Sequence, residues 1–249
     1  MQAPGTEPQL DPMHHFQGHN FVDLSVLGID ISISNSVLWM WIATAGVFLF
    51  FKLSFNKPQL VPSRMQSMAE MGYLFIEGLV RDNIGDEGKK FFPYVLTLFF
   101  FILFCYLFGL IPGSYTPTSQ LIVTGTYAGA VFIVSIAVGF MKHGVRFLMF
   151  FVPSGLPVAL YPLMVPIEVI SFLARPVSLS VRLFANMTAG HIVLGVMLFF
   201  SFTLPFYAFW APFGFSVVFT GMEIFIAFIK AYIFSILTCV YINDSLHLH

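Results

Sequence analysis

Charged side chains are scarce in this chain. Only 9% of its 249 residues are Asp, Glu, Lys or Arg, whereas 58% are hydrophobic and 32 are Phe. The mean hydropathy is +0.87, and a soluble domain of this length could not bury so much apolar surface. The sequence therefore predicts an all-α, polytopic integral membrane protein.

Several chemical signatures are also missing. The two cysteines, Cys105 and Cys239, lie in apolar stretches and predict inert buried thiols rather than a disulfide. His14, His15 and His19 lack an acidic or thiol partner at a fixed spacing, so no metal site is expected. Walker-type phosphate loops and catalytic triads are absent, so we expect a non-catalytic protein with no cofactor and no nucleic-acid partner.

Hydropathy predicts about five transmembrane helices, at residues 36–55, 91–112, 120–141, 160–200 and 206–243. The first three have nearly the ~20 residues that a bilayer needs. A continuous helix over residues 160–198 would be ~58 Å long against a ~30 Å hydrocarbon core, so it must tilt strongly, kink or break. A short re-entrant piece followed by an ordinary span is the alternative, which Pro157, Pro162, Pro166 and Pro176 keep open.

Three further features complete the predicted organisation. Residues 1–35 lack the basic and apolar regions of a signal peptide and are expected to form an external tail, followed by a single transmembrane domain over residues 36–249. An interfacial amphipathic helix is expected over about residues 64–81, with one apolar face formed by Met65, Met68, Gly72, Phe75 and Leu79. Gly125 and Gly129 form a GxxxG pair that predicts close helix packing.

The basic residues predict the orientation. Six of them flank or fill the loop between the first two spans, and Lys142 and Arg146 follow the third span. None lies in the N-terminal tail or in the loops at residues 113–119 and 200–206. By the positive-inside rule, the N-terminus is expected outside and the C-terminus, after five crossings, in the cytoplasm.

The fourth predicted span carries a polar stripe. Its members are separated by 3, 4, 3, 4 and 4 residues and share one helical face: Glu168, Ser171, Arg175, Ser178, Arg182 and Asn186. His191 lies nine residues after Arg182 and therefore about 180° around the helix. Two polar faces directed toward opposite sides of the membrane are typical of two offset aqueous half-channels.

The last two spans can be aligned as an antiparallel hairpin that turns near Pro205. This alignment places Arg182 level with Lys230, and His191 level with Glu223. Such residues can be buried pairs that fix helix packing, but ionisable side chains at membrane depth more often mark an ion path. We therefore interpret them as a route for protons.

The segment RPVSLSVRLFANMTAGH and the final helix EIFIAFIKAYIFSILTCVY resemble subunit a of the F-type ATP synthase, the stator subunit against which a ring of c subunits turns. The motifs are specific over the last ~90 residues, and the hydropathy agrees over the rest of the chain. The resemblance implies proton translocation, with the c-ring, the b-type peripheral stalk subunits and the lipid bilayer as partners. It also implies that the ATP chemistry resides on other subunits.

The resemblance implies a role for each polar residue. The arginine of the SLxxRLFxN context, here Arg182, is the stator charge, and Asn186 matches the asparagine one turn beyond it. Positions in the inner half-channel match Glu168, Ser171 and Arg175, and Ser178 lies on the same stripe. The acid of the outer half-channel and its imidazole partner match Glu223 and His191.

Lys230 departs from the family pattern, which usually has Gln at this position of the final helix. A lysine, unlike an arginine, can lose its proton when it is buried. Lys230 is therefore either a neutral hydrogen-bonding substitute for Gln, the alternative that burial favours, or a second cation that reaches toward a c-subunit carboxylate.

Two other classes of protein compete with this interpretation. A secondary transporter also carries charges at the membrane midplane, but the chain shows no long internal repeat. A structural subunit of a respiratory membrane complex would not need Arg182 for proton transport. The absence of transit-peptide character in the tail favours a bacterial inner membrane over a mitochondrial one.

Overall fold

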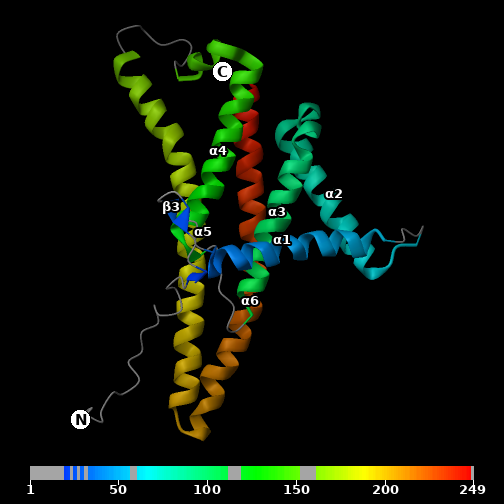
Figure 1. Ribbon diagram of the computed structural model, residues 1–249, viewed down its shortest axis with the longest axis vertical. Coiled ribbons are helices and arrows are strands. Elements are labelled where there is room, and N and C mark those ends of the chain that lie inside the picture. Colours follow the sequence, from blue (N-terminus) through cyan, green and yellow to red (C-terminus); the bar gives the residue numbers. More distant parts are fainter. Residues whose placement is uncertain are drawn as a thin grey trace.

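The computed structural model describes residues 20–22, 25–26, 29–30, 33–56, 61–111, 119–151 and 161–247. Helices dominate this part of the chain, as Figure 1 shows. They are α1 (Asn35–Ser54), α2 (Arg64–Ile84), η2 (Asp86–Lys90), α3 (Phe92–Gly109), α4 (Leu121–His143), η4 (Gly144–Phe151), α5 (Tyr161–Thr203) and α6 (Phe206–Leu246). The predicted all-α class is confirmed.

Short strands precede α1. The segment β1 (Asn20–Val22) pairs antiparallel with β4 (Ile33–Ser34), and β2 (Ser25–Val26) pairs antiparallel with β3 (Ile29–Asp30). These two- and three-residue ladders are too short to change the fold class. The predicted external position of residues 1–35 stays a prediction, and the histidines at positions 14, 15 and 19 lie outside the described residues.

The five predicted spans are confirmed as apolar helices long enough to cross a membrane. The structure places them at Asn35–Ser54, Phe92–Gly109, Leu121–Phe147, Tyr161–Ser201 and Phe209–Leu246. The first four agree with the predicted boundaries to within a few residues, apart from the end of the third. The last continues a few residues past the predicted end at residue 243.

Helices α5 and α6 form the long hairpin. Helix α5 is one continuous helix of 43 residues that includes Pro166 and Pro176, so the alternative of a broken, re-entrant segment is not what the chain adopts. At 1.5 Å per residue it is about 64 Å long, roughly twice the thickness of a hydrocarbon core. In Figure 1 the hairpin follows the longest axis of the molecule, and α1 lies across it.

The crossing of α1 over the hairpin explains how both fit one bilayer. Helix α1 has 20 residues, which gives a length of about 30 Å and matches the apolar thickness of a membrane. If α1 stands upright, the hairpin must lie strongly tilted toward the membrane plane. The tilt predicted from the length of the fourth span stays a prediction.

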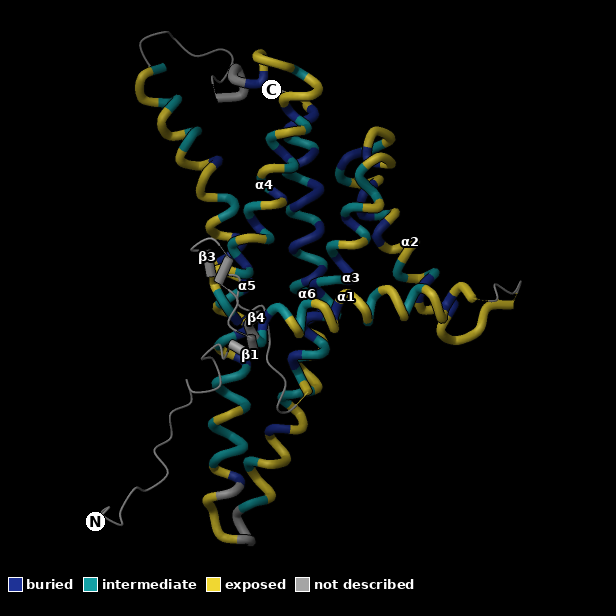
Figure 2. Tube along the Cα trace, in the orientation of Figure 1, coloured by how far each residue is buried: buried dark blue, intermediate teal, exposed yellow. Residues whose placement is uncertain are grey.

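The core forms where the second half of α6 packs against α3, α4 and α5. Figure 2 shows that buried positions concentrate in this part of α6, whereas its first half is largely exposed or half-buried. Among the largest fully buried side chains are Phe99 and Tyr106 of α3 and Phe234 and Ile242 of α6. This packing holds the end of the hairpin that lies opposite its turn.

Buried hydroxyl groups connect α4 to the hairpin. Ser135 donates to the Tyr241 carbonyl over 2.8 Å and lies 2.7 Å from the Ser245 hydroxyl. On α5, the Ser180 hydroxyl lies 3.2 Å from that of Thr124. Because lipid offers no competing hydrogen-bond partner, such pairs help to fix helix register in membranes.

The amphipathic helix predicted over residues 64–81 is present as α2. Ser63 caps its N-terminus by accepting a hydrogen bond from the Gln66 amide, and Gly85 ends it with a φ of 79°, which favours glycine. Large apolar side chains are exposed along one side of it, as expected at a membrane surface: Met65, Met68, Met71, Leu74 and Phe75.

Two members of the predicted apolar face of α2 point elsewhere. Leu79 is buried in the protein core, and a Cβ atom added at Gly72 would collide with the ring of Phe100. The predicted apolar face is therefore divided between the outside and the protein, because α2 packs on α3 and α6 as well as facing outward, and periodicity alone does not indicate this division.

Polar contacts bring three predicted cytoplasmic elements to one end of the molecule. Lys142, at the end of α4, lies 2.5 Å from Glu87 in the loop before α3 and holds the pKa of that carboxyl below its usual value. The ring Nε2 of His143 lies 2.9 Å from the Leu246 carbonyl at the end of α6. The predicted grouping of these elements on one side therefore agrees with the structure.

The GxxxG pair behaves differently from expectation. A Cβ atom at Gly125 would lie at an ordinary contact distance of 3.6 Å from the Ser180 hydroxyl, and one at Gly129 would meet nothing within 4 Å. Close packing at Gly129 was therefore a wrong prediction. One close approach occurs instead at Gly46 of α1, where a Cβ would lie 2.8 Å from the ring of Phe108.

We expect Gly46→Ala to destabilise the protein and Gly129→Ala to leave it unchanged or stabilise it by up to about 1 kcal/mol. Both changes raise helix propensity, but only the first inserts a methyl group between packed helices. The thermal midpoints of the two purified variants in detergent test this. Equal midpoints would show that α1 does not pack closely on α3.

Candidate functional site

The predicted register of the hairpin is confirmed near its middle. Arg182 and Asn186 of α5 and Lys230 of α6 line one cavity of about 120 Å³, whose other lining residues are apolar: Leu179, Leu183, Ile226, Ile229, Ile233 and Phe234. Arg182 and Lys230 therefore lie at the same depth, as their distances from the turn at Pro205 predict.

The polar stripe of α5 faces outward. Ser171, Ser178, Arg182 and Asn186 are exposed, whereas Glu168 is half-buried. Within the part of the chain that the structure describes, Arg182 makes no hydrogen bond or ion pair. A guanidinium keeps its proton under all ordinary conditions, so this helix presents an uncompensated positive charge on an open face.

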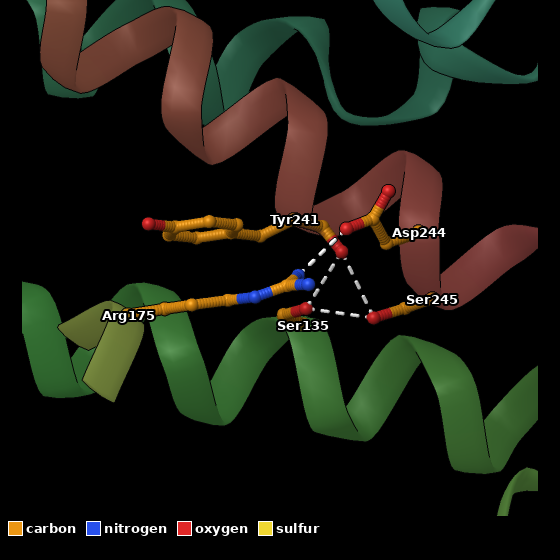
Figure 3. A network of polar contacts seen from close by, with 5 residues as sticks. All are labelled: Ser135, Arg175, Tyr241, Asp244 and Ser245. Atoms are coloured by element: carbon orange, nitrogen blue, oxygen red, sulfur yellow. Dashed lines mark hydrogen bonds and ion pairs between the residues drawn. The ribbon is translucent and has the colours of Figure 1, made fainter. Parts of the chain in front are cut away.

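Arg175, two turns earlier on the same stripe, is fully engaged, as Figure 3 shows. Its Nη1 donates to Asp244 Oδ2 over 2.6 Å, and the guanidinium lies 5.6 Å from the ring centre of Tyr241 and 5.8 Å from that of Phe172. This ion pair joins α5 to the end of α6.

The same end of α6 is held from the other side by α4. The Tyr241 carbonyl accepts hydrogen bonds from the hydroxyls of Ser135 and Ser245, at 2.8 and 2.9 Å. Arg175, Asp244 and these three residues form one network across α4, α5 and α6 (Figure 3). Arg175 therefore has a structural task here, beside its predicted place in the inner half-channel.

Asp244 is a residue that sequence reasoning missed. One signal could have found it: Arg175 needs a counter-ion at membrane depth, and the last span contains only two acids, Glu223 and Asp244. Glu223 lies near the turn, far from the level of Arg175. The need for a counter-ion, rather than the hairpin register, could therefore have suggested the pairing, because the register places Arg175 level with residues about two turns before Asp244.

Glu223 packs directly against α5. A Cβ atom added at Gly190 would overlap the Glu223 carboxylate, so only glycine leaves the space that this side chain occupies. The Oε2 atom is buried and has no hydrogen-bond partner among the described residues. His191, the next residue on α5, is half-buried, and the predicted proton contact between His191 and Glu223 stays a prediction.

Lys230 points toward α3. Its Nζ lies over the ring of Tyr106, 4.9 Å from the ring centre. The Tyr106 hydroxyl donates to the Leu183 carbonyl over 3.1 Å, one residue beyond Arg182. Three helices thus meet at the depth of the two cations.

The predictions for Glu168 and Asn186 remain untested. Neither residue makes a hydrogen bond or ion pair to a described residue.

Comparison with known proteins identifies the family. The family model described as ATP synthase A chain matches residues 37–243. The chain belongs to the ATP synthase subunit a family. The protein named ATP synthase subunit a in Magnetococcus marinus is 57% identical over 251 residues, covering 99% of this chain and 97% of that relative.

Other relatives of the same name support the assignment. The subunit a of Pelagibacter ubique is 46% identical over 240 residues, covering 96% of this chain and 98% of its own. That of Hyphomonas neptunium is 48% identical over 246 residues, covering 96% of both. Both matches run over nearly the whole chain and include all five apolar helices. The family assignment therefore supports a membrane location for the chain.

In this subunit a, we expect the loss of one partner of the Arg175–Asp244 pair to cost more stability than the loss of both. Asp244→Leu leaves a part-buried guanidinium unpaired, which costs about 2 kcal/mol at this level of burial, whereas Arg175→Leu/Asp244→Leu removes both charges. Thermal midpoints of the purified variants measure the difference. Asp86→Ala is the control, because its exposed pair with Lys89 contributes little; equal midpoints for Asp86→Ala and Asp244→Leu would contradict the role of the pair.

Proposed function

We propose that this chain is the proton-translocating subunit a of an F-type ATP synthase. It provides two half-channels and the stator arginine, Arg182, against which a ring of c subunits rotates. The observation that carries the proposal is the contrast between two arginines on one helical face: Arg175 is neutralised by Asp244, whereas Arg182 has no counter-ion among the described residues.

An unpaired guanidinium at membrane depth calls for a partner from another chain. Exposing it to lipid would cost at least about 3 kcal/mol. Four exposed positions on the same helical face as Arg182 carry small side chains, namely Ala174, Ser178, Ala185 and Ala189, which permit close approach of another helix. A neighbouring helix that carries a carboxylate, as expected of a c subunit, fits both the charge and the shape.

In this proposal, the proton enters near one end of the hairpin and leaves near the other. A proton enters from outside past His191 and Glu223 and neutralises a c-subunit carboxylate, which can then rotate through lipid. Arg182 draws the next carboxylate into its ionised form, and the released proton leaves through the inner half-channel. A fixed cation between the half-channels also opposes a direct leak of protons.

The inner half-channel is expected to run along the polar stripe below Arg182. Its proposed lining residues are Glu168, Ser171, Arg175 and Ser178, and Asn186 lies one turn beyond the arginine. Since Arg175 is paired with Asp244, we expect it to line the path as part of an ion pair rather than as a free cation.

The energetic scale suits a rotary mechanism. Each proton that crosses 100 mV supplies ~2.3 kcal/mol, so several protons are needed for each ATP. We propose that the subunit itself is non-catalytic and works with the c-ring and the b-type peripheral stalk in a bacterial inner membrane. Its N-terminus is then outside and its C-terminus cytoplasmic. A secondary transporter or a structural subunit of a respiratory complex is the alternative.

We expect Arg182→Ala to abolish ATP-driven proton pumping in a complex that still assembles. Arg182→Lys should also fail, because a desolvated lysine can lose its proton and lacks the planar fork of a guanidinium. Proton pumping by inverted membrane vesicles measures the effect, with Arg64→Ala, which removes an exposed guanidinium from α2, as the control. Wild-type pumping by an assembled Arg182→Ala complex would refute the stator assignment and leave the two alternatives.

We expect Gly190→Ala to slow proton pumping about tenfold or more, because its methyl group displaces the Glu223 carboxylate from the outer half-channel. Gly195→Ala is the matched control on the same helix, since a Cβ there meets nothing within 4 Å. Pumping rates at equal amounts of assembled complex decide the matter. Indistinguishable rates for the two variants would separate Glu223 from the proton path.

A further inference from the structure

Lys230 and Tyr106 form a contact that the family pattern does not predict. Relatives usually carry Gln where this chain has Lys230, and here the Lys230 ammonium lies 4.9 Å from the centre of the Tyr106 ring. Tyr106 is 2% exposed and lies on α3, outside the hairpin that carries the other polar residues. The contact therefore brings a third helix to the depth of Arg182.

The geometry indicates a charged lysine. No described residue makes a hydrogen bond or ion pair with Nζ, so the hydrogen-bonding role expected of a neutral substitute for Gln is not seen here. The face of an aromatic ring carries partial negative charge and attracts a cation, most strongly where water is excluded. Of the two alternatives for Lys230, the contact thus favours the cation.

Tyr106 also holds the backbone next to Arg182. Its hydroxyl donates to the Leu183 carbonyl over 3.1 Å, and both residues are buried. The ring and the hydroxyl of one side chain therefore contact α6 at Lys230 and α5 beside Arg182. A shift of α3 would move both cations together.

We propose that Tyr106 is a positioning residue for the proton path. Its ring holds a protonated Lys230 on the α3 side of the hairpin, and its hydroxyl fixes the backbone beside Arg182. The site then contains two cations at one depth: Arg182 on the open face and the half-buried Lys230 behind it. The proposal rests on the proposed function of Arg182 as the stator charge.

The charge of Lys230 adds to that of Arg182. Arg182 and Lys230 line the same small cavity, so the positive potential there is the sum of both charges. Such a potential favours the ionised form of a carboxylate that approaches from the open face, and it repels a proton that would pass between the half-channels. Because Tyr106 holds Lys230 back, the lysine does not compete with Arg182 for that carboxylate.

Fluorination of a phenylalanine ring at position 106 tests the contact between the ring and Lys230 with little change of ring shape. Phenylalanine is placed at position 106 of the assembled complex and then replaced by analogues with one, two and three fluorine atoms, which weaken the negative face stepwise. With Lys230 present, we expect ATP-driven pumping and the thermal midpoint of the complex to fall with each fluorine, by about tenfold in rate over the series. In Lys230→Gln, both readouts should stay flat over the same series.

Each outcome has a distinct meaning. A flat series in the presence of Lys230, or equal slopes with and without it, overturns the proposal and makes Tyr106 a packing residue. Rescue provides a second measure: Tyr106→Phe should retain at least several-fold more activity than Tyr106→Leu with Lys230, and this difference should vanish in Lys230→Gln. Arg182→Ala is measured in parallel. Proton pumping by that variant would refute the proposed function of Arg182. The thermal midpoints of the fluorinated series would still report on the contact between the ring at position 106 and Lys230.

Discussion

A guanidinium that cannot lose its proton, held at membrane depth without a counter-ion among the described residues of its own chain, is the constraint on which the rest of the structure depends. Under the proposed function, the open face of α5 is what allows the exposed Arg182 to reach another chain. The length of α5, 43 residues, makes that face long, and the predicted tilt of the hairpin would let polar positions approach it from either side of the membrane. The packing of α3 and α4 behind the hairpin keeps the open face rigid.

The two arginines of α5 show how context decides the role of one residue type. They are seven residues apart on one helical face, yet Arg175 meets an acid and two aromatic rings, whereas Arg182 meets a mostly apolar cavity. The paired arginine contributes to the fold, and its charge is cancelled nearby. The unpaired one retains its field, which gives it the capacity to act on a passing carboxylate.

Hydropathy alone predicted the five spans, because the thickness of a bilayer sets the length of a helix that crosses it. The hairpin register was also predictable, since antiparallel helices place residues at equal depth when they are equally distant from the turn. The crossing of α1, the inward side of α2 and the roles of Asp244 and Tyr106 were not. They depend on which helices become neighbours, and periodicity within one segment carries no information about that. Lys230 stood out in the sequence because the family pattern has Gln there. Its contact with Tyr106 on α3 could be identified only from the structure.

The pairing of α4 with the end of α6 has a consequence for biosynthesis. Ser135 finds its partner at Tyr241, 106 residues later, and His143 contacts the carbonyl of Leu246, 103 residues later. A chain that enters the membrane from its N-terminus must therefore hold α4 in lipid without these partners until α6 has been made. Closure of this long-range contact is then a late step of assembly within the chain, and the proposed half-channels would take shape only with it.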